Sequence, residues 1–163
     1  MFKIKLLILL QVSFYFFYGC TNSNIESKYK YSTGYIGGEL DGLILSNKLN
    51  SYLKMNGYYN EESNLKLRSS ISHSKDLFIT NIDNTSDREE IETSISIAIY
   101  DEILECEVYK FSKTISQFYI ITSSEYFDSN AFAQSEIKEQ NTEELVKLFM
   151  DEIFFLEGVK FSC

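Results

Sequence analysis

Few side chains in this sequence are placed to do catalytic chemistry. His73 is the only histidine, and strand alternation puts it on the same side as Leu67 and Ile71. We therefore expect a core or edge histidine with a hydrogen-bonded ring, and not a catalytic base. Glu89-Glu90 fits a solvated strand entrance, and Glu143-Glu144 fits favourable charge near a helix start. The sequence thus predicts no catalytic residue and a protein that is not an enzyme.

No motif points to a metal, a nucleotide or another bound cofactor. The chain lacks a Gly-x-Ser-x-Gly elbow, a phosphate-binding glycine loop, a CxxC pair and any cysteine–histidine cluster. Lys66 and Arg68 share one face of an expected strand, and Lys110 and Lys113 are expected to flank a hairpin tip. Solubilising charges at edges and turns explain these side chains. They are also the candidate contacts for lipid phosphates, which arginine binds bidentately.

The thiol of Cys20 is the one group for which the sequence predicts a covalent reaction. Lys3 and Lys5 precede an apolar run that ends at Gly19-Cys20, and the chain turns polar immediately afterwards. This order is typical of a secretory signal. At roughly 13 residues, against the ~20 that a bilayer requires, the run is short for a membrane span.

The ending Gly19-Cys20 resembles the lipobox of bacterial lipoproteins. The resemblance implies a diacylglyceryl thioether and an N-linked acyl chain such as palmitate on Cys20. Several chains are needed for a stable anchor, because one acyl chain alone gives only marginal membrane binding. Thr21 at the next position favours sorting to an outer membrane, again by resemblance. An ordinary cleaved signal and a retained anchor are the alternatives.

Length and charge limit the class of protein. The chain has 163 residues and a formal net charge of −9, and its signal carries two lysines and no acidic residue. Such a surface argues against nucleic acid as a partner, because that binding depends on phosphate neutralisation. We expect a signal peptide over 1–19, a lipidated N-terminus and tether over 20–27, and one domain over 28–163.

The remaining cysteines, Cys106 and Cys163, have no framework spacing. A disulfide between them and two unpaired thiols are both open, and we expect the unpaired thiols.

Periodicity predicts the element order β-α-β-β-β-α. The expected elements are a strand at 28–32 that ends before Gly34, a helix at 39–56 that ends at Gly57, a strand at 65–73 extended past a bulge at 75–76, a loop at 83–87, a strand from 91, a return strand at 114–126, and a helix from 129 or 130 to 157. Each helix has one apolar face, so both should cover the same side of a mixed four-stranded sheet, an α+β fold. The opposite side of the sheet must then be polar or covered by something else.

Two features of this order have alternative interpretations. The strand alternation changes phase at Asp101-Glu102, which indicates either a bulge in one long strand or a hairpin tip. We favour the bulge, with the turn near 111–113. The return strand is then expected to be central in the sheet, because 118–121 is apolar on both faces. Asn141-Thr142-Glu143-Glu144 resembles a capping signal and predicts a kink or division in the last helix.

With the lipobox, several short motifs resemble LptE, the lipopolysaccharide-assembly lipoprotein family. The strand 93–100 leads through a hairpin to Ser124-Glu125-Tyr126-Phe127-Asp128, and Asn130-Ala131-Phe132-Ala133 opens the acidic last helix. Asn47-Lys48-Leu49 matches a helical Asn-x-Leu pattern of the family. Glu125 interrupts the family's Ser-Tyr pair. The resemblance extends over most of the chain.

The resemblance implies a lipoprotein that plugs and supports an LptD-type β-barrel and assists lipopolysaccharide delivery to the cell surface. It would be anchored by lipid in the outer membrane, face the periplasm, and need no cofactor besides the acyl groups on Cys20. Lys66, Arg68, Lys110 and Lys113 would be the candidate contacts for lipopolysaccharide. The alternative is a lipid-anchored accessory or scaffold protein of another envelope secretion or assembly system.

Overall fold

The computed structural model describes residues 27–79, 86–121 and 127–163, so the expected signal, Cys20 and most of the tether lie outside the described residues. The described elements are β1 (Ser32–Gly37), α2 (Glu39–Met55), β2 (Leu65–Ile79), β3 (Ser86–Asp101), β4 (Cys106–Ile120) and α3 (Phe127–Leu156). The predicted order β-α-β-β-β-α is therefore confirmed.

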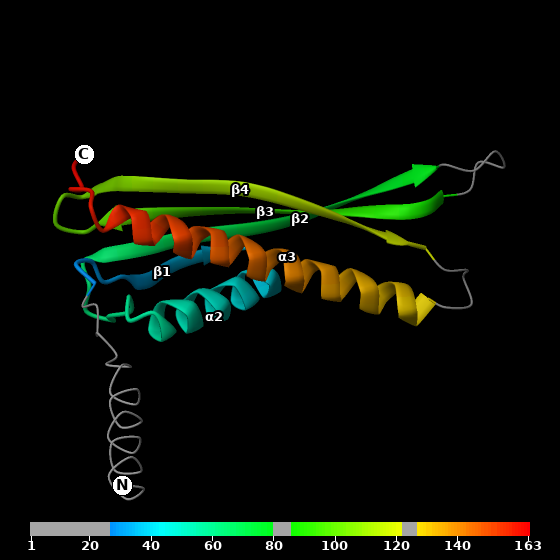
Figure 1. The fold of residues 1–163 in the computed structure, drawn as a ribbon, viewed down its shortest axis with the longest axis horizontal. Coiled ribbons are helices and arrows are strands. Elements are labelled where there is room, and N and C mark those ends of the chain that lie inside the picture. Colours follow the sequence, from blue (N-terminus) through cyan, green and yellow to red (C-terminus); the bar gives the residue numbers. More distant parts are fainter. Residues whose placement is uncertain (1–26, 80–85, 122–126) are drawn as a thin grey trace, which may run out of the picture.

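The four strands form one mixed sheet in the order β1-β2-β3-β4. β1 runs parallel to β2, and the other neighbours are antiparallel. Both helices pack on the same side, α2 against β1 and β2 and α3 against β3 and β4 (Figure 1). This confirms the predicted α+β architecture, including the single helical layer.

The strands and α3 run along the long axis of the molecule, which gives it two distinct ends (Figure 1). The proximal end holds residue 27, the β3-β4 turn and the C-terminus. The distal end holds the last residues of β2, the first residues of β3 and the start of α3.

The core lies between the helical layer and the sheet. α2 buries Leu45, Leu49 and Leu53, which recur with the helical period, on the side where it packs against β1 and β2. The fully buried apolar side chains of β3 and α3 are Ile91, Ile95, Ile97, Ile99, Leu145, Val146, Phe149 and Ile153. The predicted apolar faces of α2 and α3 are thus confirmed in their centres, whereas Leu40 and Ile44 at the edge of the α2 face are exposed.

The first strand lies later in the chain than the sequence predicted. β1 begins at Ser32 and runs through Gly34, the residue before which the sequence predicts that the strand ends. A Cβ added at Gly42 of α2 would lie 2.8 Å from the carbonyl oxygen of Gly37, so Gly42 allows α2 to pack closely on β1. The prediction of a strand at 28–32 is therefore wrong.

The hairpin tip is at 102–105, so the preferred interpretation of a bulge at Asp101 is wrong and the alternative is right. Asp101 Oδ1 accepts hydrogen bonds from the backbone N–H groups of Ile103 (2.8 Å) and Leu104 (3.1 Å), which closes the turn. The return strand is consequently β4, which starts at Cys106 and not at residue 114.

β4 is an edge strand and not the central strand that the run 118–121 suggested. Phe118 and Ile120 are 52% and 79% exposed, so this apolar run lies at the surface and is not covered by neighbouring described strands. The bulge predicted at 75–76 in β2 is also absent, because β2 pairs with β3 in continuous register from Leu65 to Phe78. β3 begins at Ser86, inside the predicted loop 83–87.

The last helix is continuous from Phe127 to Leu156, so the predicted division at Asn141 is wrong. Thr142 Oγ1 donates to the carbonyl oxygen of Lys138, one turn earlier, and does not cap a new helix. Asn141 is buried against the sheet, as described below.

Cys106 and Cys163 form a disulfide, contrary to the expectation of unpaired thiols. The new position of the turn explains the difference: it places Cys106 at the proximal end of β4, beside the C-terminal segment. Their Cα atoms are 6.1 Å apart, within the range that a disulfide spans.

Candidate interaction surface

No described element covers the side of the sheet away from the helices, which is mostly polar, and we call it the open face. Its central rows, read from β2 to β4, are Ser70–Ser96–Ser112, Ser72–Ser94–Thr114 and Ser74–Glu92–Ser116. Ser94 Oγ and Thr114 Oγ1 are 2.7 Å apart and form a hydrogen bond across β3 and β4. The sequence analysis required a polar or covered second side, and the structure shows that this side is polar.

The proximal part of the open face carries the predicted basic residues of β2. Arg68 stacks on Tyr100, with its guanidinium carbon 3.6 Å from the ring centroid. Lys66 Nζ lies 3.9 Å from Glu102 Oε2 in the β3-β4 turn. Register places Ala98 between Arg68 and Lys110, so one transverse row of the sheet brings Arg68 and Lys110 to the same face.

Lys113 does not join this group. Lys110 and Lys113 lie in the middle of β4 and do not flank the turn, contrary to the prediction. They are three residues apart in a strand, so they point to opposite sides of the sheet. Lys113 pairs with Ile95, a core residue, and its exposed side chain lies on the helical side at the edge of β4.

The distal part of the open face is acidic and aromatic. Asp76 of β2 is directly opposite Glu90 of β3, and Glu92 follows two residues later. Beyond them the rings of Phe78 and Phe118 meet edge to face, with centroids 5.4 Å apart. Register also places Arg88 between Phe78 and Ile120 at this distal end, and Glu107 beside Tyr100 at the proximal end. The open face therefore has a mainly basic end, a hydroxyl-bearing centre and a mainly acidic end.

His73 is part of a buried polar chain under α3. Its Nδ1 lies 2.8 Å from Thr93 Oγ1, and Asn141 Nδ2 donates to Thr93 Oγ1 (3.2 Å) and to the carbonyl oxygen of Ile91 (3.3 Å). Gln117 Nε2 donates to Asn141 Oδ1 at 2.7 Å. All these groups have partners, which confirms the predicted hydrogen-bonded core histidine.

The protonation of His73 follows from its surroundings. Burial lowers the pKa of His73, Asp41 opposes this shift, and Lys138 adds to it. The Nε2 atom lies 3.7 Å from Asp41 Oδ2, beyond hydrogen-bond distance. A neutral ring can accept a hydrogen bond from the Thr93 hydroxyl at Nδ1, which leaves its Nε2–H facing a cavity of about 60 Å³ that has room only for water-sized molecules.

Sequence reasoning missed a second polar cluster, centred on Glu89 at the distal end. Glu89 was interpreted as solvated, but it is only 6% exposed. Tyr119 Oη and Gln134 Nε2 donate to Glu89 Oε2, and Lys75 Nζ lies 3.4 Å from Glu89 Oε1. Burial and the Glu89 carboxylate raise the pKa of Tyr119. Cross-strand register, which requires the correct hairpin, is the signal that could have found this cluster.

α2 and α3 are joined by an ionic cluster around Glu143, which the sequence analysis had assigned to a helix start. Glu143 accepts hydrogen bonds from Lys48 of α2 (3.2 Å) and Tyr52 (3.1 Å), and it pairs with Lys147 at 2.9 Å. Lys147, Lys48 and Tyr52 together lower the pKa of Glu143 to about 2.

We expect this cluster to make stability depend on acidic pH. The folded-state pKa of Glu143 is lower than its unfolded value, so its stabilisation is fully present above about pH 4.3 and is lost as pH falls through about 2. The melting temperature of the native chain should therefore fall more steeply over this window than that of Glu143→Gln. Equal slopes in thermal melts would show that the cluster contributes nothing. Glu144→Gln is the neighbouring control.

Within the described parts of the chain, no group of ligating side chains is arranged to hold a metal ion. Neither α2 nor α3 has the length and apolarity of a bilayer-crossing helix.

Comparison with known proteins gives likenesses of fold. No protein-family profile matches the chain, and no curated protein sequence matches it. The fold is similar to that of lipoprotein B of Nitrosomonas europaea (TM-score 0.63, 10% identity, 88% of this chain and 97% of that one). It is also similar to rare lipoprotein B of Shewanella oneidensis (TM-score 0.53, 15% identity, 79% and 98%) and to a minor lipoprotein of Acinetobacter baumannii (0.55, 14%, 79% and 91%). The chain therefore has a fold found among bacterial lipoproteins.

Proposed function

We propose that this chain is an LptE-like outer-membrane lipoprotein that faces the periplasm and plugs an LptD-type β-barrel. The likeness of its fold to those of rare lipoprotein B and other bacterial lipoproteins supports this proposal. The predicted acylation of Cys20 would supply the anchor, and the role requires no catalysis and no other cofactor.

The observation that carries the proposal is the polar open face. A sheet covered by helices on one side normally either buries its other side or leaves it solvated. Here the uncovered side is long, has hydroxyl rows at its centre and has opposite charges at its ends. The lumen of a large membrane barrel is polar, so a polar face can pack against the barrel wall and form hydrogen bonds with it.

The basic end of the open face supports a contact with lipopolysaccharide phosphates. Lys66, Arg68 and Lys110 share this face, and Arg68 is held by Tyr100 with its guanidinium at the surface. Lys113 lies on the other side of the sheet, so we leave it out of this contact.

A bulky substitution on the open face should release the barrel. We expect affinity isolation of the full-length chain from detergent-solubilised membranes to recover a large LptD-like barrel. Ser96→Trp should reduce that recovery roughly tenfold, because overpacking of a tight contact costs about 1–3 kcal/mol. Mass spectrometry of the recovered proteins measures the effect.

Ser51→Trp is the matched control, since Ser51 is an exposed residue of α2 that lines a groove beside α3, on the helical side of the molecule. Equal loss with Ser51→Trp would show that the contact is not confined to the open face. Recovery of secretion-system proteins in place of a barrel would contradict the LptD partnership and favour the accessory role.

A further inference from the structure

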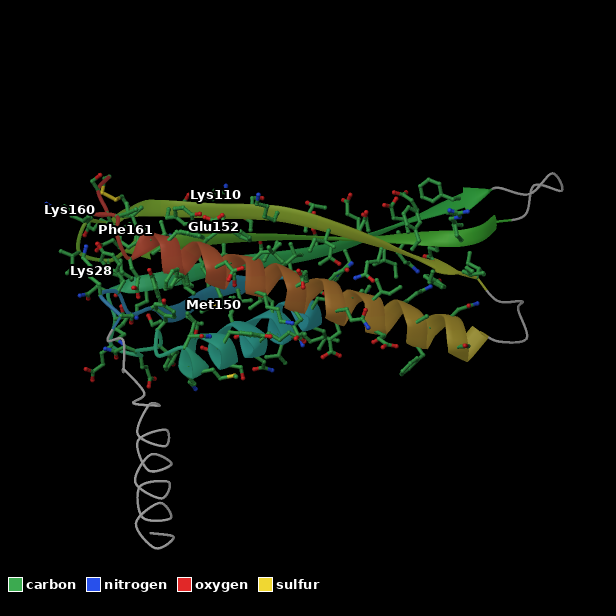
Figure 2. The ribbon with its side chains drawn as sticks, viewed as in Figure 1. Lys28, Lys110, Met150, Glu152, Lys160 and Phe161 are labelled. Atoms are coloured by element: carbon green, nitrogen blue, oxygen red, sulfur yellow. A yellow bond between two sulfur atoms is a disulfide. The ribbon has the colours of Figure 1, made fainter. Side chains whose placement is uncertain are left out.

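A groove of about 330 Å³ at the proximal end collects basic side chains in an otherwise acidic protein. Lys28, Lys30 and Lys160 line it, with the aromatic rings of Tyr29 and Phe161 between them. Figure 2 shows Lys28, Lys160 and Phe161 together at this end, where the described chain begins. We call this the anchor-end groove.

The groove has a fixed framework. The rings of Tyr29 and Phe161 pack with centroids 4.6 Å apart, and Tyr29 Oη donates to the carbonyl oxygen of Val159 at 2.7 Å. The Cys106–Cys163 disulfide ties the segment that carries Lys160 to β4. Lys30 Nζ donates to the carbonyl oxygen of Gly57 at 2.5 Å, which holds the opposite wall.

The lysines of the groove have no carboxylate partner among the described residues, whereas Lys48, Lys75 and Lys147 are paired with glutamates. Asp101 is the one acidic side chain in the lining, and its Oδ1 is already occupied by the backbone of the β3-β4 turn. With three lysines and one aspartate in its lining, the groove carries net positive charge, and Ser63 and Asn64 are further polar groups.

We propose that the anchor-end groove binds the phosphate of an anionic phospholipid in the bilayer that carries the anchor. This inference rests on the proposed acylation of Cys20. Lys28 is eight residues from Cys20, so the extended tether spans at most about 28 Å and keeps the groove near the headgroups. Anionic headgroups attract lysines within a Debye length of the surface. The contact would set the orientation of the domain relative to the membrane.

Hydrogen–deuterium exchange of the acylated full-length chain in lipid nanodiscs tests the proposal. Discs of phosphatidylcholine with phosphatidylglycerol should protect the backbone around Lys28 and Lys160, and discs of phosphatidylcholine alone should not. High salt should abolish the protection without releasing the chain from the discs. In Lys28→Gln/Lys160→Gln, protection should fall by up to roughly 30-fold, since each lysine near an anionic surface is worth about fivefold.

The control is Lys113→Gln/Lys138→Gln, which removes the same charge from exposed and half-buried positions away from the groove and should keep the protection. Equal protection in both kinds of disc, equal loss in both double variants, or equal protection by inorganic phosphate added to neutral discs would overturn the proposal. A chain that fails to float with vesicles would contradict the proposed anchor and this inference together. A chain that floats but shows no lipid-dependent protection would overturn this inference alone.

Discussion

Replacing Phe149 by alanine is expected to lower the free energy of unfolding by about 3–5 kcal/mol. Phe149 is fully buried in the C-terminal third of α3, where its ring packs on Phe111 of β4 with centroids 5.5 Å apart. The substitution removes this contact and leaves a cavity at the junction of α3 with the sheet, because neighbouring side chains relax only partly. Urea denaturation with the disulfide intact measures the change.

Phe155→Ala is the control for this prediction, because it deletes the same side chain from the same helix. Phe155 is 73% exposed, so its removal should change stability by about 0.5 kcal/mol or less. Similar losses from the two substitutions would show that α3 does not pack on the sheet through the face described here.

Replacing Gly38 by alanine should have the next largest effect, a loss of about 3 kcal/mol or more. Gly38 has a φ of 113°, and an added Cβ would lie 2.7 Å from both the Cγ2 and the carbonyl oxygen of Ile71. Relief would require α2 to move away from β2 at its first turn. Chemical denaturation again gives the magnitude.

Gly57→Ala separates backbone strain from this collision. Gly57 also has a positive φ, 71°, but an added Cβ would meet nothing within 4 Å. We expect its loss to be about 1–2 kcal/mol, the cost of the left-handed conformation alone. A loss as large as that of Gly38→Ala would mean that conformation, and not packing, dominates at both glycines.

Side-chain periodicity predicted the elements that bury one face along their whole length. α2 was located to within a residue, including its end at Gly57, because its leucines recur with the helical period and Gly57 takes the positive φ of a helix C-cap. The alternation of β3 was equally clear, because its odd positions face the helices and its even positions face solvent. These signals are local, so the sequence carries them directly.

The errors occur where tertiary contacts override a local signal. Leu104 continues an apolar alternation past Asp101 that is typical of a strand, but it is exposed in the turn, whose backbone is held by Asp101. Asn141 and Thr142 looked like a capping signal, but Asn141 is used to bind β3 across the core. A sequence window contains no information on those distant partners.

By itself, then, the amino-acid sequence determined the element order, the helical layer, the apolar faces and the structural role of His73, because each depends on residue spacing within one element. Only the tertiary structure decided the strand that follows the turn, the Cys106–Cys163 disulfide, the buried Glu89 cluster and the grouping of Lys66 and Arg68 with Lys110 but not with Lys113. Each of these depends on register between strands. A shift of register by one residue turns every side chain to the other side of the sheet, and that register is set by contacts between segments far apart in the chain.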